Sequence, residues 1–318
     1  MRILWLYKYD RKYNFDKWLH LEYVRHVKQL GYDIIAYGPR LEEEYYDIML
    51  VPYRPSLSWE ELIDMSGADI AILNTRSRAF EHYSPFTGEK QGCWLPDGFA
   101  KSKKVIKVLI DEDAHYEKDD LWVKEMGFSL TLQRHKSQAD RKDWVVKTKW
   151  LPFSVNTSIF TPQGTGKRIN KVCFTGSMTE KYTDRQNAIR RLYNYNLIDI
   201  FPTGIKRDQE YLDCLRSYKC CLSGASNYDI CAAKNFEIMA SGAVLLTNNF
   251  TGIRDLFYDD TYSLYDNDND NIIARATKIL FDDGYAEHLS KNALNCIKAR
   301  HTDEIRTKQL IEILNKEL

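Results

Sequence analysis

A cation and a carboxylate stand three residues apart in the stretch AKNFEIMASG, residues 233–242. The pattern predicts a helix that stops at Gly242, where a positive φ costs a glycine little, followed by an apolar run. Three-residue spacing places Lys234 and Glu237 on one face of this helix. Neither charge can be buried without a partner, so we expect both at the amino-terminal end of the helix, beside a bound ligand. The alternative is an ordinary salt bridge between two surface side chains.

Short apolar runs and helical patterns alternate along the whole chain. Runs that are apolar throughout favour parallel strands covered by helices on both faces, so the predicted fold class is α/β. In the first half we expect strands at residues 3–6, 33–37, 48–51, 69–73, 105–110, 129–132 and 147–151, and a helix at 15–30. In the second half we expect strands at residues 171–175, 198–201, 219–223, 243–247 and 262–265, and helices at 185–195, 208–218, 232–241, 269–282, 284–299 and 302–316.

An irregular segment, PFSVNTSIFTPQGTGK at residues 152–167, separates the two halves. Its two prolines, two glycines and small polar residues predict a linker rather than a helix or a strand. We therefore expect two α/β domains with a cleft between them. Ligands of open α/β sheets bind beyond the carboxyl ends of the strands, and the amino-terminal ends of helices such as that of Lys234 point there.

The composition excludes several classes of protein. The 318 residues carry 45 Lys and Arg against 45 Asp and Glu, which disfavours a basic nucleic-acid-binding module. No run approaches the ~18 apolar residues of a membrane-spanning helix. The stretch ILWLY at residues 3–7 is too short for a signal sequence. The seven cysteines form no CxxC pair, which favours buried free thiols in a reducing cytosol and hence a cytoplasmic protein.

The segment KNFEIMASG resembles the donor-nucleotide motif of retaining GT-B glycosyltransferases of family 4, and is most similar to the CgeB-like, spore-maturation branch. Four further segments resemble this family in the family's order, at residues 151–162, 172–185, 210–223 and 301–306. The resemblance is detailed over residues 151–318, whereas the first 150 residues match only as a Rossmann-like half. It implies the GT-B architecture, two Rossmann-like domains facing a central cleft. Residues 1–160 would bind the acceptor, residues 161–300 would bind the nucleotide sugar, and the helix at 301–318 would cross back to the first domain.

The resemblance also implies an activity, the transfer of a sugar from a nucleoside diphosphate sugar to an acceptor hydroxyl with retained configuration. A UDP-sugar is the favoured donor, and it is a substrate, so we expect no cofactor. We also expect no metal, because protein cations can neutralise the diphosphate. The nearest acidic pair, Asp111 with Asp113, has no credible metal context.

Donor-binding residues follow from the matched positions. Glu237 would accept hydrogen bonds from the ribose hydroxyls. The amides at residues 176–177 follow a strand and could approach an anion. Asp229, eight positions before Glu237, would contact the donor sugar as a catalytic residue; its alternative is a loop or capping role. Arg185 has the alternative of bracing its own helix. The predicted donor-binding residues are Gly176, Ser177, Lys181, Arg185, Lys234, Asn235 and Glu237.

Three loops that follow strands in the first half, at residues 7–15, 74–78 and 111–116, are expected to bind the acceptor. His115 is the second candidate catalytic residue, because the unperturbed pKa of a histidine lies near neutrality and acidic neighbours would favour the charged form. Its alternative is a plain loop histidine. The predicted acceptor-binding residues are Tyr9, Arg11, Arg76 and Asp113.

Two other functions remain open. One is a DNA glycosyltransferase that acts on hydroxymethylated bases of phage DNA, suggested by basic residues within 101–107 and 134–149. Solvated helix and strand faces are the alternative interpretation of those residues. The other is a non-catalytic protein that binds a sugar nucleotide. The acceptor could be a glycan, a small molecule, a protein or modified DNA.

Overall fold

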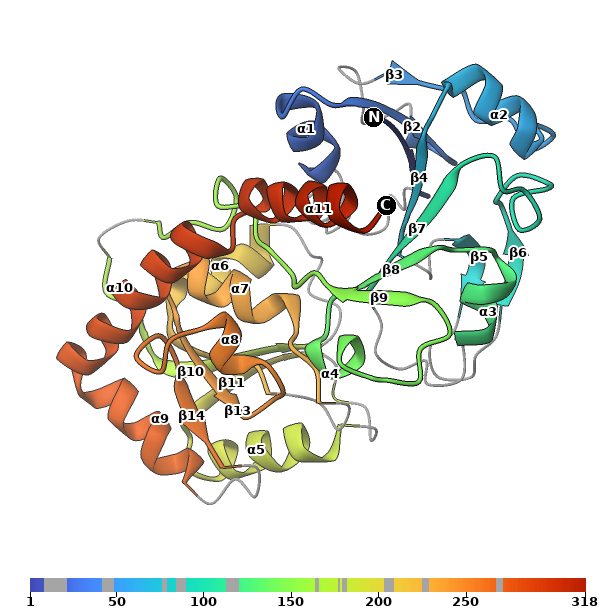
Figure 1. Ribbon diagram of the computed structural model, residues 1–318. Coiled ribbons are helices and arrows are strands. Elements are labelled where there is room, and N and C mark those ends of the chain that lie inside the picture. Colours follow the sequence, from blue (N-terminus) through green and yellow to red (C-terminus); the bar gives the residue numbers. More distant parts are fainter. Residues whose placement is uncertain are drawn as a thin grey trace. The chain divides into compact units, whose positions relative to one another are not determined.

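The computed structural model describes residues 1–8, 22–41, 49–75, 79–83, 90–112, 120–163, 166–176, 178, 182–202, 209–224, 229–266 and 271–318 (Figure 1). The chain folds into two compact units. Unit 1 comprises Met1–Pro152 and Arg306–Leu318, and unit 2 comprises Phe153–Ile305. The acceptor and donor roles that the sequence assigns to the two halves stay predictions.

Unit 1 is built on a seven-stranded parallel sheet in the order β3-β2-β1-β4-β7-β8-β9. Its strands are β1 (Arg2–Leu6), β2 (Asp33–Tyr37), β3 (Met49–Leu50), β4 (Ile70–Asn74), β7 (Ile106–Asp111), β8 (Leu130–Gln133) and β9 (Lys147–Trp150). The helices of this unit are α1 (Glu22–Gln29), α2 (Trp59–Ser66), α3 (Asp120–Glu125), α4 (Lys136–Ala139) and most of α11 (Asp303–Glu317).

Both faces of β1 are buried, which explains why its sequence is apolar without interruption. Ile3 and Trp5 pack in a cluster with residues of α1 and α11, whereas Leu4 and Leu6 pack in a second cluster with residues of α2. Successive side chains of a strand point to opposite faces, so one short run supplies both cores. The end of α11 contributes Leu314 to the first of these cores.

Unit 2 contains a five-stranded parallel sheet in the order β11-β10-β12-β13-β14. The strands are β10 (Ile169–Gly176), β11 (Ile198–Pro202), β12 (Tyr218–Leu222), β13 (Val244–Asn248) and β14 (Ser263–Tyr265). The helices are α5 (Thr183–Asn194), α6 (Gln209–Ser217), α7 (Ala233–Ala240), α8 (Ile253–Leu256), α9 (Ile272–Phe281) and α10 (Asp283–Arg300). Strands β10 and β12 are neighbours although β11 lies between them in the chain, so the strand order reverses at this pair. In such sheets the ligand crevice lies at the carboxyl ends of the strands where the order reverses.

The predicted α/β fold class is confirmed, and each predicted strand overlaps a strand of the structure. The predicted helix at residues 15–30 is present as α1, and its residues 15–21 lie outside the described residues. The sequence analysis missed α2, α3, α4 and α8, and it also missed a hairpin of β5 (Phe80–Tyr83) with β6 (Lys90–Cys93). The seven cysteines are free thiols, five of them buried.

None of the helices that the structure describes combines the length and the apolar character that crossing a membrane requires. In the same described ranges, no three His, Cys, Asp or Glu side chains are grouped so that they could hold a metal ion.

Candidate functional site

Helix α7 positions the cation and the carboxylate that the sequence singled out. It follows β12 in the chain. Ala232 is the N-cap residue of the helix, and no side-chain hydrogen bond caps this end. Gly242, with φ +76°, comes directly after the helix, as the sequence predicted. Six consecutive residues from Asn235 to Ala240 are buried, so this part of the helix is enclosed on all sides, whereas Ala233 and Lys234 are partly exposed.

Lys234 lies against the carboxyl end of β10. Its Nζ donates a hydrogen bond to the backbone carbonyl of Thr175 and lies 5.6 Å from the ring centroid of Phe174. Burial, and then the positive charge of Arg185, lower the pKa of Lys234 to about 8, whereas the carboxylate of Glu237 opposes the shift. The ammonium group is therefore held at the end of the central strand in an environment that disfavours its charge.

Gly176, the last residue of β10, makes this arrangement possible. Its φ is +153°, and a Cβ atom at this position would lie 3.0 Å from Lys234 Nζ and 3.2 Å from Phe174 Cζ. Any other residue would therefore strain the backbone and displace the lysine. Glycine keeps the strand end open at the point where the sheet order reverses.

Arg185, in the first turn of α5, brings a second positive charge to the same place. Its guanidinium carbon lies 4.2 Å from the ring centroid of Tyr182 and 5.8 Å from that of Phe174. Burial lowers the pKa of Arg185 from its ordinary value. The stacking on Tyr182 agrees with the bracing role that the sequence left open, and the proximity to Lys234 agrees with a ligand role.

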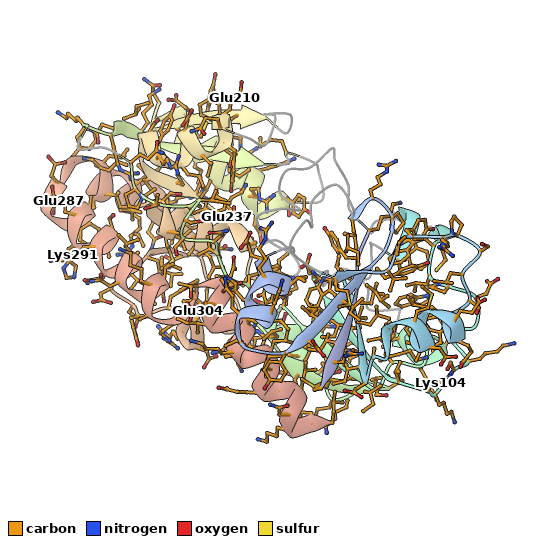
Figure 2. All side chains as sticks on the ribbon, turned by 90° about the horizontal axis from the view of Figure 1, so that it is seen from above. Lys104, Glu210, Glu237, Glu287, Lys291 and Glu304 are labelled. Carbon is orange, nitrogen blue, oxygen red and sulfur yellow. The ribbon has the colours of Figure 1, made fainter. Side chains whose placement is uncertain are left out.

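Glu237 is only 4% exposed and is held by a residue that the sequence analysis missed. The hydroxyl of Tyr211, on α6, donates a hydrogen bond to Glu237 Oε2. Burial, and then the negative charge of Glu237, raise the pKa of Tyr211 well above its ordinary value, so the phenol stays protonated and donates. Figure 2 shows Glu237 inside unit 2, whereas Glu210 and Glu287 lie at its periphery.

Asn235 and Asp229 have well-defined local contacts. Asn235 is 2% exposed, its Nδ2 lies 3.6 Å from Cys231 Sγ, and its Oδ1 has no hydrogen-bond partner among the described residues. The Asp229 carboxylate accepts hydrogen bonds from Thr251 N at 2.7 Å and from Thr251 Oγ1 at 2.5 Å. These contacts match the loop role that was the alternative for Asp229, and its catalytic role stays a prediction.

The structure thus brings together Gly176, Arg185, Lys234 and Glu237 around the reversal point of the unit 2 sheet. The remaining predicted site residues lie outside the described residues: Tyr9, Arg11, Arg76, Asp113, His115, Ser177 and Lys181.

A buried polar cluster lies at the carboxyl ends of β7 and β8 in unit 1, and the sequence analysis did not single it out. Asp111 accepts a hydrogen bond from Gln133 Nε2 at 3.0 Å. Arg134 donates through Nη1 to Tyr23 Oη and to the carbonyl of Pro152, both at 3.1 Å. The signal in the sequence was the polar triplet QRH, residues 133–135, at the end of an apolar strand.

The basic runs that suggested a DNA acceptor are largely engaged inside unit 1. Lys104 pairs with Glu60 and Asp64, at 2.9 and 2.7 Å. Lys107 is buried, and its Nζ donates to three backbone carbonyl groups. Further along the chain, Lys147 and Lys149 pair with Glu317. These contacts match the interpretation as ordinary structural charges and do not favour DNA as the acceptor.

Comparisons with known proteins agree with this architecture. Residues 181–312 match a family model described as glycosyl transferase-like. No curated protein sequence matches the chain. Among solved structures, a glycosyltransferase from Rickettsia africae ESF-5 is similar with a TM-score of 0.65 and 14% identity, covering 99% of this chain and 98% of the other.

Two further solved structures are similar over nearly their whole length. Sucrose-phosphate synthase from Thermosynechococcus elongatus has a TM-score of 0.64 at 13% identity, covering 99% of each chain. HepE from Anabaena, in complex with UDP and glucose, has a TM-score of 0.62 at 11% identity, covering 99% of this chain and 100% of the other. Together these likenesses show that the chain has the GT-B fold.

Proposed function

We propose that the chain is a glycosyltransferase that binds a nucleoside diphosphate sugar in unit 2 and transfers the sugar to an acceptor hydroxyl. One observation carries the proposal: Lys234 and Arg185 converge on the ring of Phe174 beside the glycine that ends β10. The match of residues 181–312 to a glycosyl transferase-like model supports the same reading.

Electrostatics favours an anion at this place. Burial withdraws the lysine from water, and the neighbouring positive charge of Arg185 repels it, which is why the pKa of Lys234 falls to about 8. A bound diphosphate would oppose this shift, because its negative charge stabilises the charged lysine. The same cations would stabilise the charge that develops on the diphosphate as it leaves the sugar.

The carboxylate of Glu237 completes the donor site in this proposal. It lies three residues after Lys234 on α7 and can accept hydrogen bonds from two ribose hydroxyls. The donor class that we propose is a UDP-sugar, since the HepE structure holds UDP and glucose. The transferred sugar in this proposal is a hexose or a pentose, and the glucose in the HepE structure supports a hexose.

The finer assignments rest on the resemblance of KNFEIMASG and of the four other segments to family 4. We propose on that basis a retaining transferase of the CgeB-like branch. Lys234 and Arg185 would neutralise the diphosphate without a metal. Acceptor binding by Tyr9, Arg11, Arg76 and Asp113, and the catalytic roles of His115 and Asp229, belong to the same proposal.

The decisive experiment is a thermal-shift screen of nucleoside diphosphates and nucleotide sugars, followed by an assay of diphosphate release from each sugar that binds. A ligand present at 100 times its Kd stabilises the folded state by about 2.7 kcal/mol, so binding will be seen as a raised Tm. Release of UDP from a UDP-sugar would support the transferase and exclude a protein that only binds. A chain that neither binds nor cleaves any nucleotide sugar would contradict the proposal.

A further inference from the structure

The hydrogen bond from Tyr211 to Glu237 joins two helices that flank β12. Tyr211 is the third residue of α6, and Glu237 is the fifth residue of α7. From this contact we infer that Tyr211 is a positioning residue: it fixes the Glu237 carboxylate in the orientation that receives the donor's ribose hydroxyls. The inference rests on the proposed function, because it assigns a role within the donor site.

The hydrogen bond fixes one oxygen of the Glu237 carboxylate, because Oε2 accepts the tyrosine hydroxyl. A carboxylate offers about four lone-pair sites, so accepting one hydroxyl does not exhaust its capacity as an acceptor. Tyr211 can act only as a donor to the carboxylate, because its raised pKa keeps the phenol protonated. The phenol therefore stays available as a donor over the working pH range, and its hydrogen bond restrains the orientation of the buried carboxylate.

Tyr211 is itself anchored by the segment that begins unit 2. Its ring meets the ring of Phe160 edge-on, with centroids 6.4 Å apart. Further along α6, Arg216 donates to the carbonyl groups of Thr161 and Ile159, at 3.0 and 2.5 Å. The segment at residues 159–161 thus holds α6 at two points, so the tyrosine hydroxyl is placed without help from a ligand. Such preorganisation lowers the entropy cost of binding.

The same unit offers a matched control. The hydroxyl of Tyr218 donates a hydrogen bond to Asp199 Oδ2 at 2.9 Å, so this pair also joins a tyrosine to a carboxylate. Neither residue of this pair belongs to the predicted donor site. If a tyrosine-carboxylate bond matters only for stability, Tyr211→Phe and Tyr218→Phe will behave alike. If Tyr211 positions Glu237, only Tyr211→Phe will reduce the preference of the site for a nucleotide that carries both ribose hydroxyls.

The test is calorimetric titration with UDP and with 2′-deoxy-UDP. The proteins compared are wild type, Tyr211→Phe, Tyr218→Phe, Glu237→Ala and the double variant Tyr211→Phe/Glu237→Ala. We expect Tyr211→Phe to weaken UDP binding about tenfold, as the loss of a hydrogen bond to a charged group does, and to weaken 2′-deoxy-UDP binding much less. The preference for UDP over 2′-deoxy-UDP therefore shrinks. Tyr218→Phe keeps the wild-type preference. In the Glu237→Ala background, Tyr211→Phe adds little, because the carboxylate that Tyr211 positions is already absent.

The outcomes distinguish the positioning role of Tyr211 from the proposed function of the chain. If the wild-type protein binds UDP and Tyr211→Phe keeps both the affinity and the preference, the positioning role is wrong and the donor site stands. If the wild-type protein binds no nucleoside diphosphate, the proposed function is wrong, and the positioning role of Tyr211 is then wrong too. Should Tyr211→Phe not fold, Glu237→Asp gives a second test, since it withdraws the carboxylate from Tyr211 by one methylene. A full wild-type preference for UDP in Glu237→Asp would overturn the positioning role.

Discussion

Lys234 and Arg185 share one aromatic ring: Lys234 Nζ lies 5.6 Å and the Arg185 guanidinium carbon 5.8 Å from the ring centroid of Phe174. The two cations come from different helices, α7 and α5, and meet beside the end of β10. The negative face of an aromatic ring attracts both. Their mutual repulsion is nevertheless part of what lowers the pKa of Lys234, and an anion bound beside them would offset it.

Removing either charge of α7 should weaken the binding of the donor nucleotide without unfolding the protein. We expect Lys234→Ala and Glu237→Ala each to cost about 1–3 kcal/mol in the free energy of UDP binding, the usual loss for a hydrogen bond to a charged group. Calorimetric titration measures it. The matched control is Lys171→Ala, which removes a lysine paired with Asp199 at 2.7 Å in the same unit. Equal UDP affinity in Lys234→Ala and wild type would contradict the assignment.

The affinity for UDP should fall as the pH rises above about 8. The pKa of Lys234 is about 8 in the ligand-free protein, and a bound diphosphate favours the charged lysine and so raises this pKa. Below pH 8 the lysine is already protonated, whereas above it each binding event must take up a proton. We therefore expect affinity to decrease by up to about tenfold per pH unit between pH 8 and the higher pKa of the complex.

Proton uptake gives a direct check on the pH dependence. Titration with UDP at pH 8.5 in two buffers of different ionisation enthalpy will reveal the protons taken up by wild type. Lys234→Met removes the titrating group and should abolish that uptake while keeping most of the side-chain volume. Identical uptake in the variant would assign the proton to another group.

Gly176→Ala should damage the donor site more than the fold. The new Cβ atom meets Lys234 Nζ at 3.0 Å and Phe174 Cζ at 3.2 Å, and the φ of +153° is one that alanine rarely adopts. We expect weaker UDP binding together with a modest loss of stability, about 1–3 kcal/mol for backbone strain of this kind. Alanine at Gly166, where nothing lies within 4 Å of the added atom, is the control and should bind UDP as wild type does.

Much of the fold could be predicted because its strands are buried on both faces. The run RILWL of β1 supplies two cores at once, and such runs stand out between helical patterns. Helix α2 was missed although Ser58 and Glu61 form a capping box at its start. Its buried apolar residues, Trp59, Leu62 and Ile63, span little more than one turn, so the apolar repeat is short. The β5–β6 hairpin was missed because its partners pair only locally and outside the main sheets.

The part of the candidate site that lies on one helix could be predicted from the sequence. Lys234 and Glu237 could be placed together from their spacing alone. The hydrogen-bond partners of the site residues come from elsewhere in the chain. Tyr211 is 26 residues from Glu237 in the sequence, and Thr251 is 22 residues from Asp229. Such pairs depend on which helices and turns the sheet order makes neighbours, and local patterns do not encode that order.

The end of α11 should stabilise unit 1 selectively. Leu314 is 1% exposed and packs in the cluster that contains Ile3 and Trp5 of β1. Leu314→Ala leaves a cavity in this core, so we expect the free energy of unfolding of unit 1 to fall by about 2–5 kcal/mol. Hydrogen exchange of the full-length protein should show lost protection in β1 and β2, and unchanged protection in β10 and β12.

The control is Glu312→Ala, at an exposed position on the same helix, which should change the free energy of unfolding by less than about 0.5 kcal/mol. Equal loss of protection in both sheets after Leu314→Ala would show that the two units unfold as one, contrary to their separate cores.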